Sequence, residues 1–265
     1  MSSKVKEAEQ CLKEAEKYLK TSMFKWKPDF DSAANEYQKA GTFAAISCMK
    51  DMNNCNDSVK FFEKACALFR ENGIPDTAAL SMERGAKMLE PKLPEKAAEF
   101  YLTAADIAML ESKNHQAAEF CGNAARIYLK LKKYEDAIDA VNKQMGLLRE
   151  CEDTRPCGRL VVCQVLIHLT REDFVAAQKA FNDGKSYVED DELYSLTQLL
   201  TGFDEMDSKQ IIKALEHPFI KSLDTEYTKL ARNIQQKHGA MIQSTSAPQP
   251  THVEETVDDE AGALL

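Results

Sequence analysis

The feature that most constrains the fold is a pattern that recurs about every 20 residues between positions 76 and 144. A small residue is followed four positions later by a larger apolar residue, and usually by another small residue three positions after that. The four instances are Ala78, Met82 and Gly85; Ala97, Tyr101 and Ala104; Ala117, Cys121 and Ala124; and Ala137, Val141 and Gln144. Offsets of four and seven share one helical face, so each instance predicts a helix with a buried stripe.

Helices at this spacing, joined by short turns, form helical hairpins of about 39–40 residues. A tetratricopeptide hairpin has about 34 residues but shows the same alternation of small and large side chains. We therefore predict an all-α, tetratricopeptide-like α-solenoid, a twisted sheet of antiparallel helical hairpins. Residues 159–170 are expected to form its most apolar helix. Shorter segments at 192–202, 208–216 and 218–234 predict a C-terminal helical cap.

Helix starts and one doubtful region can also be read from the sequence. Five prolines lie where a new helix is expected, since proline suits a first helical turn. They are Pro28, Pro75, Pro94, Pro156 and Pro218. Residues 41–55 fit the pattern poorly and contain a polar break at Asn53.

The solenoid with its helical cap is predicted over residues 1–236. Residues 237–265 are predicted to be a disordered acidic tail, because they combine low hydrophobicity with charge of one sign.

Composition excludes several classes of function. The chain has 34 basic and 43 acidic residues and a formal net charge of −9, which argues against a nucleic-acid binder. Its eight cysteines include no C-x-x-C pair and no metal-ligand spacing to the five histidines. We expect reduced thiols, no metal and no cofactor. The sequence shows no signal peptide and no apolar run of about 20 residues, so a soluble cytoplasmic protein is predicted.

Residues that could carry chemistry do not form a catalytic pattern, and we expect no enzyme. The phosphate-binding, zinc-protease and nucleophile-elbow motifs are absent. His168 lies among apolar residues, and a hydrogen-bonded core histidine is favoured over a general base there. The acids at 189–192 point in different directions on a helix, so they indicate a solvated or partner-facing helix start more than a cation site.

The connection after the first helix is the most distinctive surface candidate. It contains Met23, Phe24, Lys25, Trp26 and Lys27, and Trp26 is the only tryptophan. One interpretation is that Phe24 and Trp26 fold back to cap the core. The other is a reversible membrane contact, since tryptophan favours the headgroup level and nearby lysines are attracted to anionic lipid.

Four segments resemble gamma-type soluble NSF attachment proteins. They are "KYLKTSMFKWKPDFDSAANEYQKA" (17–40), "FRENGIPDTAALSMERGAKMLE" (69–90), "YEDAIDAVNKQ" (134–144) and "VLIHLTREDFVAAQKAF" (165–181). The resemblance covers about residues 14–236. It implies an adaptor that binds SNARE complexes, meaning bundles of syntaxin-type and related helices. The adaptor also recruits the NSF ATPase and stimulates SNARE disassembly in vesicle fusion and intracellular transport.

The resemblance also implies sites and a location. It assigns membrane contact to residues 23–27 and SNARE contact to Arg126 and Arg159, while Asn123 occupies a place that is often basic. ATPase contact is assigned to four residues, namely Asp204, Glu205, Leu264 and Leu265. The implied location is the cytoplasm, peripheral on vesicle and organelle membranes.

One departure from the family pattern is a gap of about forty residues near Ala40 and Gly41, the length of one helical hairpin. Two alternatives to the adaptor remain open. The first is a tetratricopeptide-like scaffold for other partners, and the second is a lipid-surface adaptor unconnected to NSF.

Overall fold

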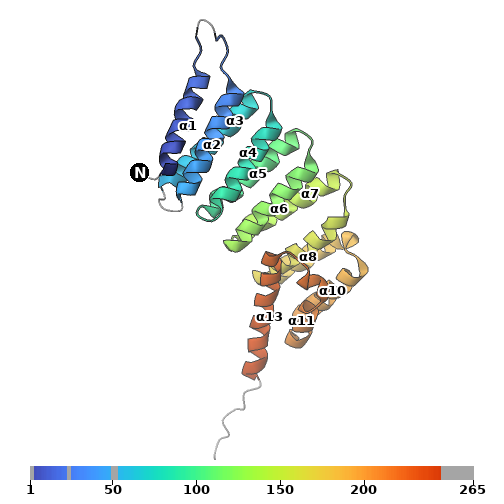
Figure 1. Cartoon of the computed structure of the whole chain (residues 1–265). Helices are drawn as coiled ribbons and strands as arrows, with labels where there is room; N and C mark the ends of the chain where they lie inside the picture. The colour runs from blue at the N-terminus through green and yellow to red at the C-terminus, as the bar shows by residue number, and fades with distance from the viewer. Residues whose placement is uncertain (1–2, 23–24, 49–52, 246–265) are drawn as a thin grey trace, which may run out of the picture.

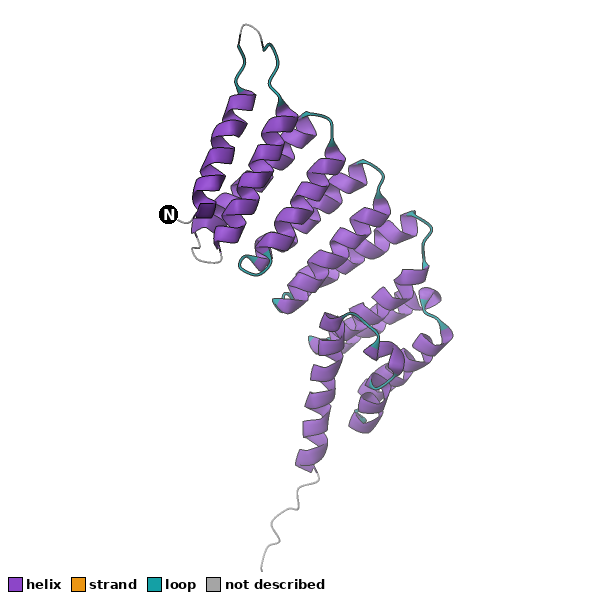
Figure 2. Cartoon of the chain, viewed as in Figure 1, coloured by secondary structure: helices purple, strands orange, loops and turns teal. Residues whose placement is uncertain are grey.

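The computed structural model describes residues 3–22, 25–48 and 53–245, and within these ranges it consists of α-helices joined by turns and short loops. The prediction of an all-α fold is confirmed for this part of the chain, as Figure 2 shows. The helices are α1 (Ser3–Leu19), α2 (Phe30–Cys48), α3 (Asn53–Glu71), α4 (Pro75–Leu89), α5 (Pro94–Leu110), α6 (Asn114–Lys130), α7 (Tyr134–Glu150), α8 (Arg155–Thr170), α9 (Phe174–Gly184), α10 (Asp190–Asp204), α11 (Ser208–Leu215), α12 (Pro218–Lys221) and α13 (Thr225–Thr245). A 3₁₀ turn, Lys185–Tyr187, follows α9.

The helices form an elongated array (Figure 1). Helices α1 to α7 lie side by side and alternate in direction, as expected for a solenoid of hairpins. Helices α8 to α13 form a second group, in which α13 packs on α8 and α11. The connection between α1 and α2 projects beyond one end of the row, and α13 lies at the opposite end of the molecule. The predicted solenoid and its C-terminal cap are both present.

The small residues of the repeat lie at the helix interfaces. Ala78, Ala97, Ala117 and Ala137 are all fully buried, and the larger residues four positions later are buried beside them. A methyl side chain lets neighbouring helices approach closely, and the larger residue fills the space between them. The predicted stripe is confirmed in all four helices.

The turns repeat with the same period as the helices. A residue in the left-handed conformation follows each of α5 to α8: Ser112 (φ 58°), Lys132 (φ 58°), Glu152 (φ 59°) and Glu172 (φ 63°). After each one, the next backbone N–H donates to a carbonyl five residues earlier, at 2.9–3.0 Å. These bonds satisfy carbonyl groups at the helix ends. Sequence inspection missed this repeat because none of the four residues is glycine, the usual residue at such a turn.

The predicted helix starts are confirmed at four prolines, and a helix also begins near the fifth, although Pro28 lies two residues before the helix and not in its first turn. Helices α4, α5 and α12 begin at Pro75, Pro94 and Pro218, and Pro156 is the second residue of α8. The helix α2 begins at Phe30, beyond Pro28. There the carboxylate of Asp29 accepts a hydrogen bond from the backbone N–H of Ser32 at 3.0 Å, so Asp29 caps the helix and Pro28 precedes the cap.

The region around Gly41 is more regular than its sequence suggests. Helix α2 continues through Gly41 to Cys48, and α3 begins at Asn53. The hydroxyl of Ser58 donates to the carbonyl of Gly41 at 2.8 Å, and a Cβ at Gly41 would lie 2.9 Å from the ring of Phe62. Because glycine removes that clash, α3 packs directly on α2. The weak pattern reflects a contact made by backbone instead of by an apolar side chain.

The C-terminal cap differs from the prediction in two ways. The expected helix at 218–234 is interrupted, since α12 ends at Lys221 and α13 begins at Thr225. Helix α13 then continues to Thr245, so the predicted start of the disordered tail at 237 is wrong. Residues 246–265 lie outside the described residues. Helix α8 is the most extensively buried, as expected from its apolar sequence.

The cysteines are mostly free thiols. Among the cysteines whose side chains the structure describes, six have no disulfide partner, and they are Cys11, Cys66, Cys121, Cys151, Cys157 and Cys163. Burial raises the pKa of the Cys66 and Cys121 thiols to about 11, so both stay protonated at neutral pH. Cys55 is disulfide-bonded, and the expectation that every cysteine is reduced is therefore wrong. No helix in the described ranges is long and apolar enough to cross a membrane.

Candidate functional site

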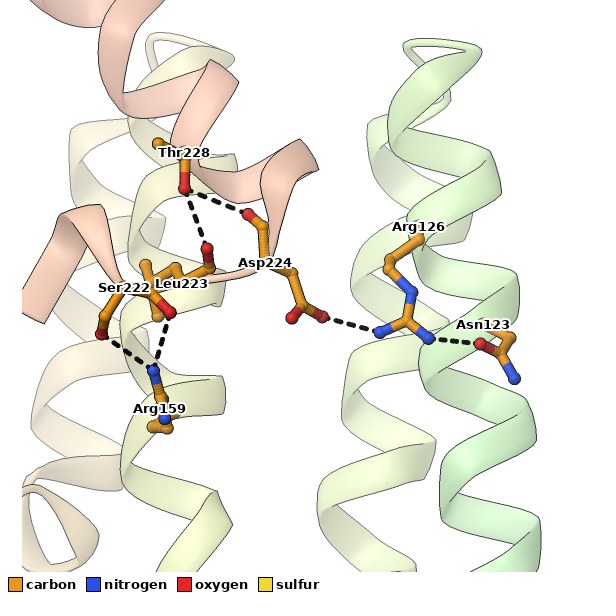
Figure 3. Close-up of polar contacts among 7 residues, drawn as sticks. All are labelled: Asn123, Arg126, Arg159, Ser222, Leu223, Asp224 and Thr228. Atoms are coloured by element: carbon orange, nitrogen blue, oxygen red, sulfur yellow. Dashed lines mark hydrogen bonds and ion pairs between the residues drawn. The ribbon is translucent and has the colours of Figure 1, made fainter.

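The short segment between α12 and α13 contacts the side chains of two arginines, Arg126 and Arg159 (Figure 3). The guanidinium of Arg126, on α6, pairs with the carboxylate of Asp224 at 2.6 Å and donates to the side-chain oxygen of Asn123. The guanidinium of Arg159, on α8, donates to the carbonyl and the hydroxyl of Ser222, both at 3.0 Å. The two arginines from separate helices thus hold one short segment.

Two further contacts stabilise this arrangement. The guanidinium of Arg159 lies 5.5 Å from the centre of the Phe219 ring, a cation–π distance. The hydroxyl of Thr228 donates to the carbonyl of Leu223 at 3.0 Å, which closes the first turn of α13. The segment linking α12 and α13 is therefore fixed on the surface of α6 and α8, although both arginines remain partly exposed.

A polar cleft surrounds the two arginines. It consists of two adjoining cavities of about 410 Å³ and 280 Å³ that share Arg126 and Asp224. The residues lining the first are Glu90, Tyr101, Asn123, Arg126, Lys130, Asp224, Thr225 and Glu226. The second adds Arg159, Gln144 and Tyr227, among others. We call this the arginine cleft. The structure thus brings Arg126 and Arg159 into one site, with acidic and basic groups mixed along it.

The phenols of the arginine cleft stay protonated at neutral pH. Burial raises the pKa of Tyr101 to about 12, with a smaller contribution from the carboxylate of Glu90. Burial also raises the pKa of Tyr227 well above its usual value. The ammonium of Lys130 pairs with Glu90 at 2.5 Å, so its charge is already compensated. Such a cleft is suited to recognising charged side chains of a protein, through ion pairs and hydrogen bonds.

The connection between α1 and α2 presents Trp26 to solvent. Ser22 and Lys25 exchange backbone hydrogen bonds at 3.0 and 2.9 Å, which hold the two sides of the connection together. The ammonium of Lys25 donates to the carbonyl of Tyr18 at 2.8 Å, so this charge supports the connection. Trp26 is 88% exposed, and Lys27 is exposed next to it. The interpretation that Trp26 folds back as a core cap is wrong; Met23 and Phe24 lie outside the described residues.

The other end of the molecule carries the acidic candidates. Asp204 is the last residue of α10, and Glu205 follows it; both are exposed. Leu199 and Leu200, which precede them, are buried in the bundle. The acidic pair therefore lies on a turn whose position is fixed by apolar packing. Leu264 and Leu265 lie outside the described residues.

Two other sequence candidates have structural explanations. Glu189 and Glu192 form a capping box at the start of α10, which confirms the expectation of an acidic helix start. His168 is not the hydrogen-bonded core residue that was expected, since its buried Nδ1 has no partner within the described ranges. Burial lowers the pKa of His168, with the nearby Arg171 charge acting in the same direction, so the ring is neutral at pH 7. No group of three or more metal-binding side chains occurs in the described part of the chain.

The partners of the two arginines were missed at the sequence level. Ser222 and Asp224 lie in a segment that was assigned to a continuous helix. The available signal was the run Ser222, Leu223, Asp224 and Thr225, because serine and aspartate are common where a helix begins. The sequence does not show which side chains contact such a break, because these contacts depend on how the helices pack in the folded chain.

Comparison with known proteins identifies the family. The model of the soluble NSF attachment protein family, SNAP, matches residues 14–238. The chain belongs to this family. The arginine cleft and the acidic turn after α10 lie within the matched range. So does the connection between α1 and α2 that carries Trp26, which we call the Trp26 turn. Residues 246–265 lie outside the matched range.

Two relatives within the SNAP family cover most of the chain. The gamma-soluble NSF attachment protein of Dictyostelium discoideum is 27% identical over 271 aligned positions, covering 88% of this chain and 84% of that protein. The gamma-soluble NSF attachment protein of Arabidopsis thaliana is 25% identical, covering 88% of this chain and 78% of that protein. Among solved structures, BtubC (BKLC) from P. vanneervenii is 14% identical and covers 98% of this chain and 100% of that one. Its TM-score of 0.39 is too low to support any argument.

The Dictyostelium alignment also bears on chain length. It spans 271 positions, although only 88% of this 265-residue chain takes part. That SNAP protein therefore has residues within the matched region that this chain lacks. The Arabidopsis alignment covers the same share of this chain in 236 positions and has no insertion of comparable length. The two alignments thus differ, and the expected gap in the family pattern stays a prediction. The expected position of the gap, near Ala40 and Gly41, falls inside the continuous helix α2. Where the additional residues lie stays a prediction.

Proposed function

We propose that the chain is an adaptor that binds SNARE complexes and recruits and stimulates the NSF ATPase, and that it performs no catalysis itself. The observation that carries this proposal is the separation of three candidate surfaces along one elongated helical array. The Trp26 turn is at one end, the arginine cleft lies beside α6 and α8, and the acidic turn at Asp204 and Glu205 belongs to the opposite group of helices. Such an arrangement allows membrane, SNARE bundle and ATPase to be held at once.

In the proposed complex, the SNARE bundle contacts the side of the array that carries the arginine cleft. The guanidinium groups of Arg126 and Arg159 would pair with carboxylates of the bundle, since arginine forms geometrically specific pairs with such groups. Arg126 already pairs with Asp224, so an incoming carboxylate would compete with an intrachain one. Both partners of that pair are partly exposed, and such pairs contribute only about 0–1 kcal/mol. The competition is therefore weak.

The membrane contact gives a first prediction. Replacing Phe24 and Trp26 with Ser is expected to weaken flotation of the protein with anionic liposomes, because an exposed aromatic that enters the interface contributes about 1.5–3 kcal/mol. The thermal midpoint should change little, since Trp26 is 88% exposed. Replacing the exposed Leu110 with Ser is the matched control and should leave flotation unchanged. A large fall in the midpoint would instead assign the aromatics to the core and contradict the membrane contact.

The ATPase contact is tested by a pull-down of purified NSF on the immobilised chain at increasing salt. Asp204 and Glu205 are exposed acids, so their attraction to a basic surface should be screened as salt rises. We expect retention of NSF at low salt, a steady loss at higher salt, and reduced retention by the Asp204→Asn, Glu205→Gln variant. Absence of retention at every salt concentration would instead favour a scaffold for other partners or a lipid-surface adaptor.

A further inference from the structure

A small apolar cavity lies away from the arginine cleft, between α8, α9, α10 and α13. Its volume is about 290 Å³, enough for one or two side chains, and its apolar walls include Leu169, Phe174, Phe203 and Ile234. The rings of Phe174 and Phe203 are stacked with their centres 6.4 Å apart, and the His238 ring meets Phe203 edge-on at 5.2 Å. These ring contacts fix the shape of the cavity, so it does not depend on a ligand to form.

Exposed apolar residues line this cavity or lie close in sequence to residues that line it. Val175 follows Phe174 and is 77% exposed, and Met241 lines the cavity and is 43% exposed. Met206 is 88% exposed, and its backbone N–H donates to the carbonyl of Phe203 at 3.3 Å. Exposed apolar groups gathered around a preformed pocket are typical of protein-binding surfaces, where one anchoring side chain contributes much of the affinity.

The charges around the cavity are mainly acidic. Lys237 lines the cavity, but its ammonium is paired with the carboxylate of Glu172. His238 also lines the cavity, and burial lowers its pKa, so it is neutral at pH 7. Asp204, Glu205 and Asp207 are exposed on the turn that follows Phe203. The rim therefore has an excess of negative charge, which favours a partner with basic residues beside its apolar anchor.

We propose that this cavity receives an apolar side chain of NSF that is flanked by lysine or arginine. The inference rests on the proposed function and specifies it further. The acids of the turn attract the basic flanks and speed the encounter, and the apolar side chain then enters the cavity and slows dissociation. Contact at this end of the array thus combines a salt-dependent part with a salt-resistant part.

The test uses the full chain with three exposed residues replaced together, as Val175→Ser, Met206→Ser and Met241→Ser. We expect the Kd for purified NSF to rise about tenfold, because anchoring contacts commonly account for at least that change. The thermal midpoint should stay close to that of the unchanged protein. Leu110→Ser, which removes an apolar residue that is 74% exposed at the end of α5, is the control and should leave the Kd unaltered.

A second variant, Asn233→Trp, fills the cavity from an exposed position on α13 and should weaken NSF binding in the same way. If the triple variant folds poorly, the Kd of the Asn233→Trp variant for NSF tests the proposed role of the cavity instead. The residual binding of either variant should be more sensitive to salt than binding by the unchanged chain, since only the acidic contact is left.

Three results would overturn the inference. An unchanged Kd in both variants, with binding still weakened by Asp204→Asn and Glu205→Gln, would exclude the cavity while the proposed function stands. Tighter NSF binding after deletion of residues 246–265 would identify the chain's own C-terminal segment as the occupant of the cavity. Failure of the unchanged chain to bind NSF would remove the proposed function and this inference together.

Discussion

Replacing Phe62 with Ala is expected to lower the free energy of unfolding by about 3–5 kcal/mol. Phe62 is fully buried on α3 and connects four successive helices. Its ring packs over the backbone of Gly41 on α2 and Gly85 on α4, where an added Cβ would lie 2.9 and 3.0 Å from ring carbons. It also meets the Phe100 ring of α5 edge-on at 6.5 Å. Two glycines and an aromatic ring thus shape the space that Phe62 fills.

The loss is expected to be large because that space cannot close easily. Glycine has no side chain to move into the cavity, and rigid helix backbones form two of its walls. In a solenoid each unit is stabilised mainly by its neighbours, so the damage should be concentrated in α2 to α5. Amide exchange in α8 to α13 should be affected much less.

Urea unfolding followed by circular dichroism measures this effect. Leu80→Ala is the control, because Leu80 is half-exposed on α4 and its replacement should change the free energy by about 0.5 kcal/mol or less. A loss of less than about 1 kcal/mol for Phe62→Ala would mean that α2 to α5 do not pack around Phe62 as described.

The second large effect is expected on SNARE binding. Reversing the charge of both Arg126 and Arg159 to Glu should raise the Kd for an assembled SNARE complex at least about tenfold, since each attractive pair becomes a repulsive one. Both side chains lie in the arginine cleft and are partly exposed, so α6 and α8 should still form. The change also removes the contacts that hold the segment between α12 and α13, and a further variant is needed to separate the two effects.

The Asp224→Asn variant separates recognition from structure. It breaks the pair with Arg126 but leaves the arginine charge free for a partner. If the arginines recognise SNARE carboxylates, this variant should bind as well as the unchanged chain, or slightly better, because the intrachain competitor is gone. If Asp224→Asn weakens SNARE binding as much as the double arginine variant, the arginines serve only to hold the segment between α12 and α13.

The sequence was informative wherever local rules determine structure. The small residues at 78, 97, 117 and 137 predicted four buried helix faces, because helical periodicity depends only on neighbours along the chain. The prolines at 75, 94 and 218 predicted helix starts for the same reason. In contrast, the continuous helix through Gly41 was missed, since the stabilising contact is made by Phe62 of the next helix.

The candidate sites were predictable in part. The sequence left two interpretations of Trp26 open, a core cap and a membrane contact, and the structure excludes the first because the side chain is 88% exposed. The membrane contact stays a prediction. The pairing of Arg126 with Asp224 joins residues on α6 and at the start of α13, a distance in sequence that no motif spans. The apolar cavity between α8, α9, α10 and α13 was missed for the same reason, because its walls come from four separate segments.

The most direct test of the adaptor function is the rate at which NSF disassembles a liposome-anchored SNARE complex, measured by loss of energy transfer between labelled SNARE helices. With ATP present, we expect the chain to increase this rate well above that of NSF alone, and the Arg126→Glu, Arg159→Glu variant to give little increase. Chelating magnesium, which stops ATP hydrolysis, should abolish the difference. If the rate is the same with and without the unchanged chain, the proposal that it links NSF to SNARE complexes is contradicted.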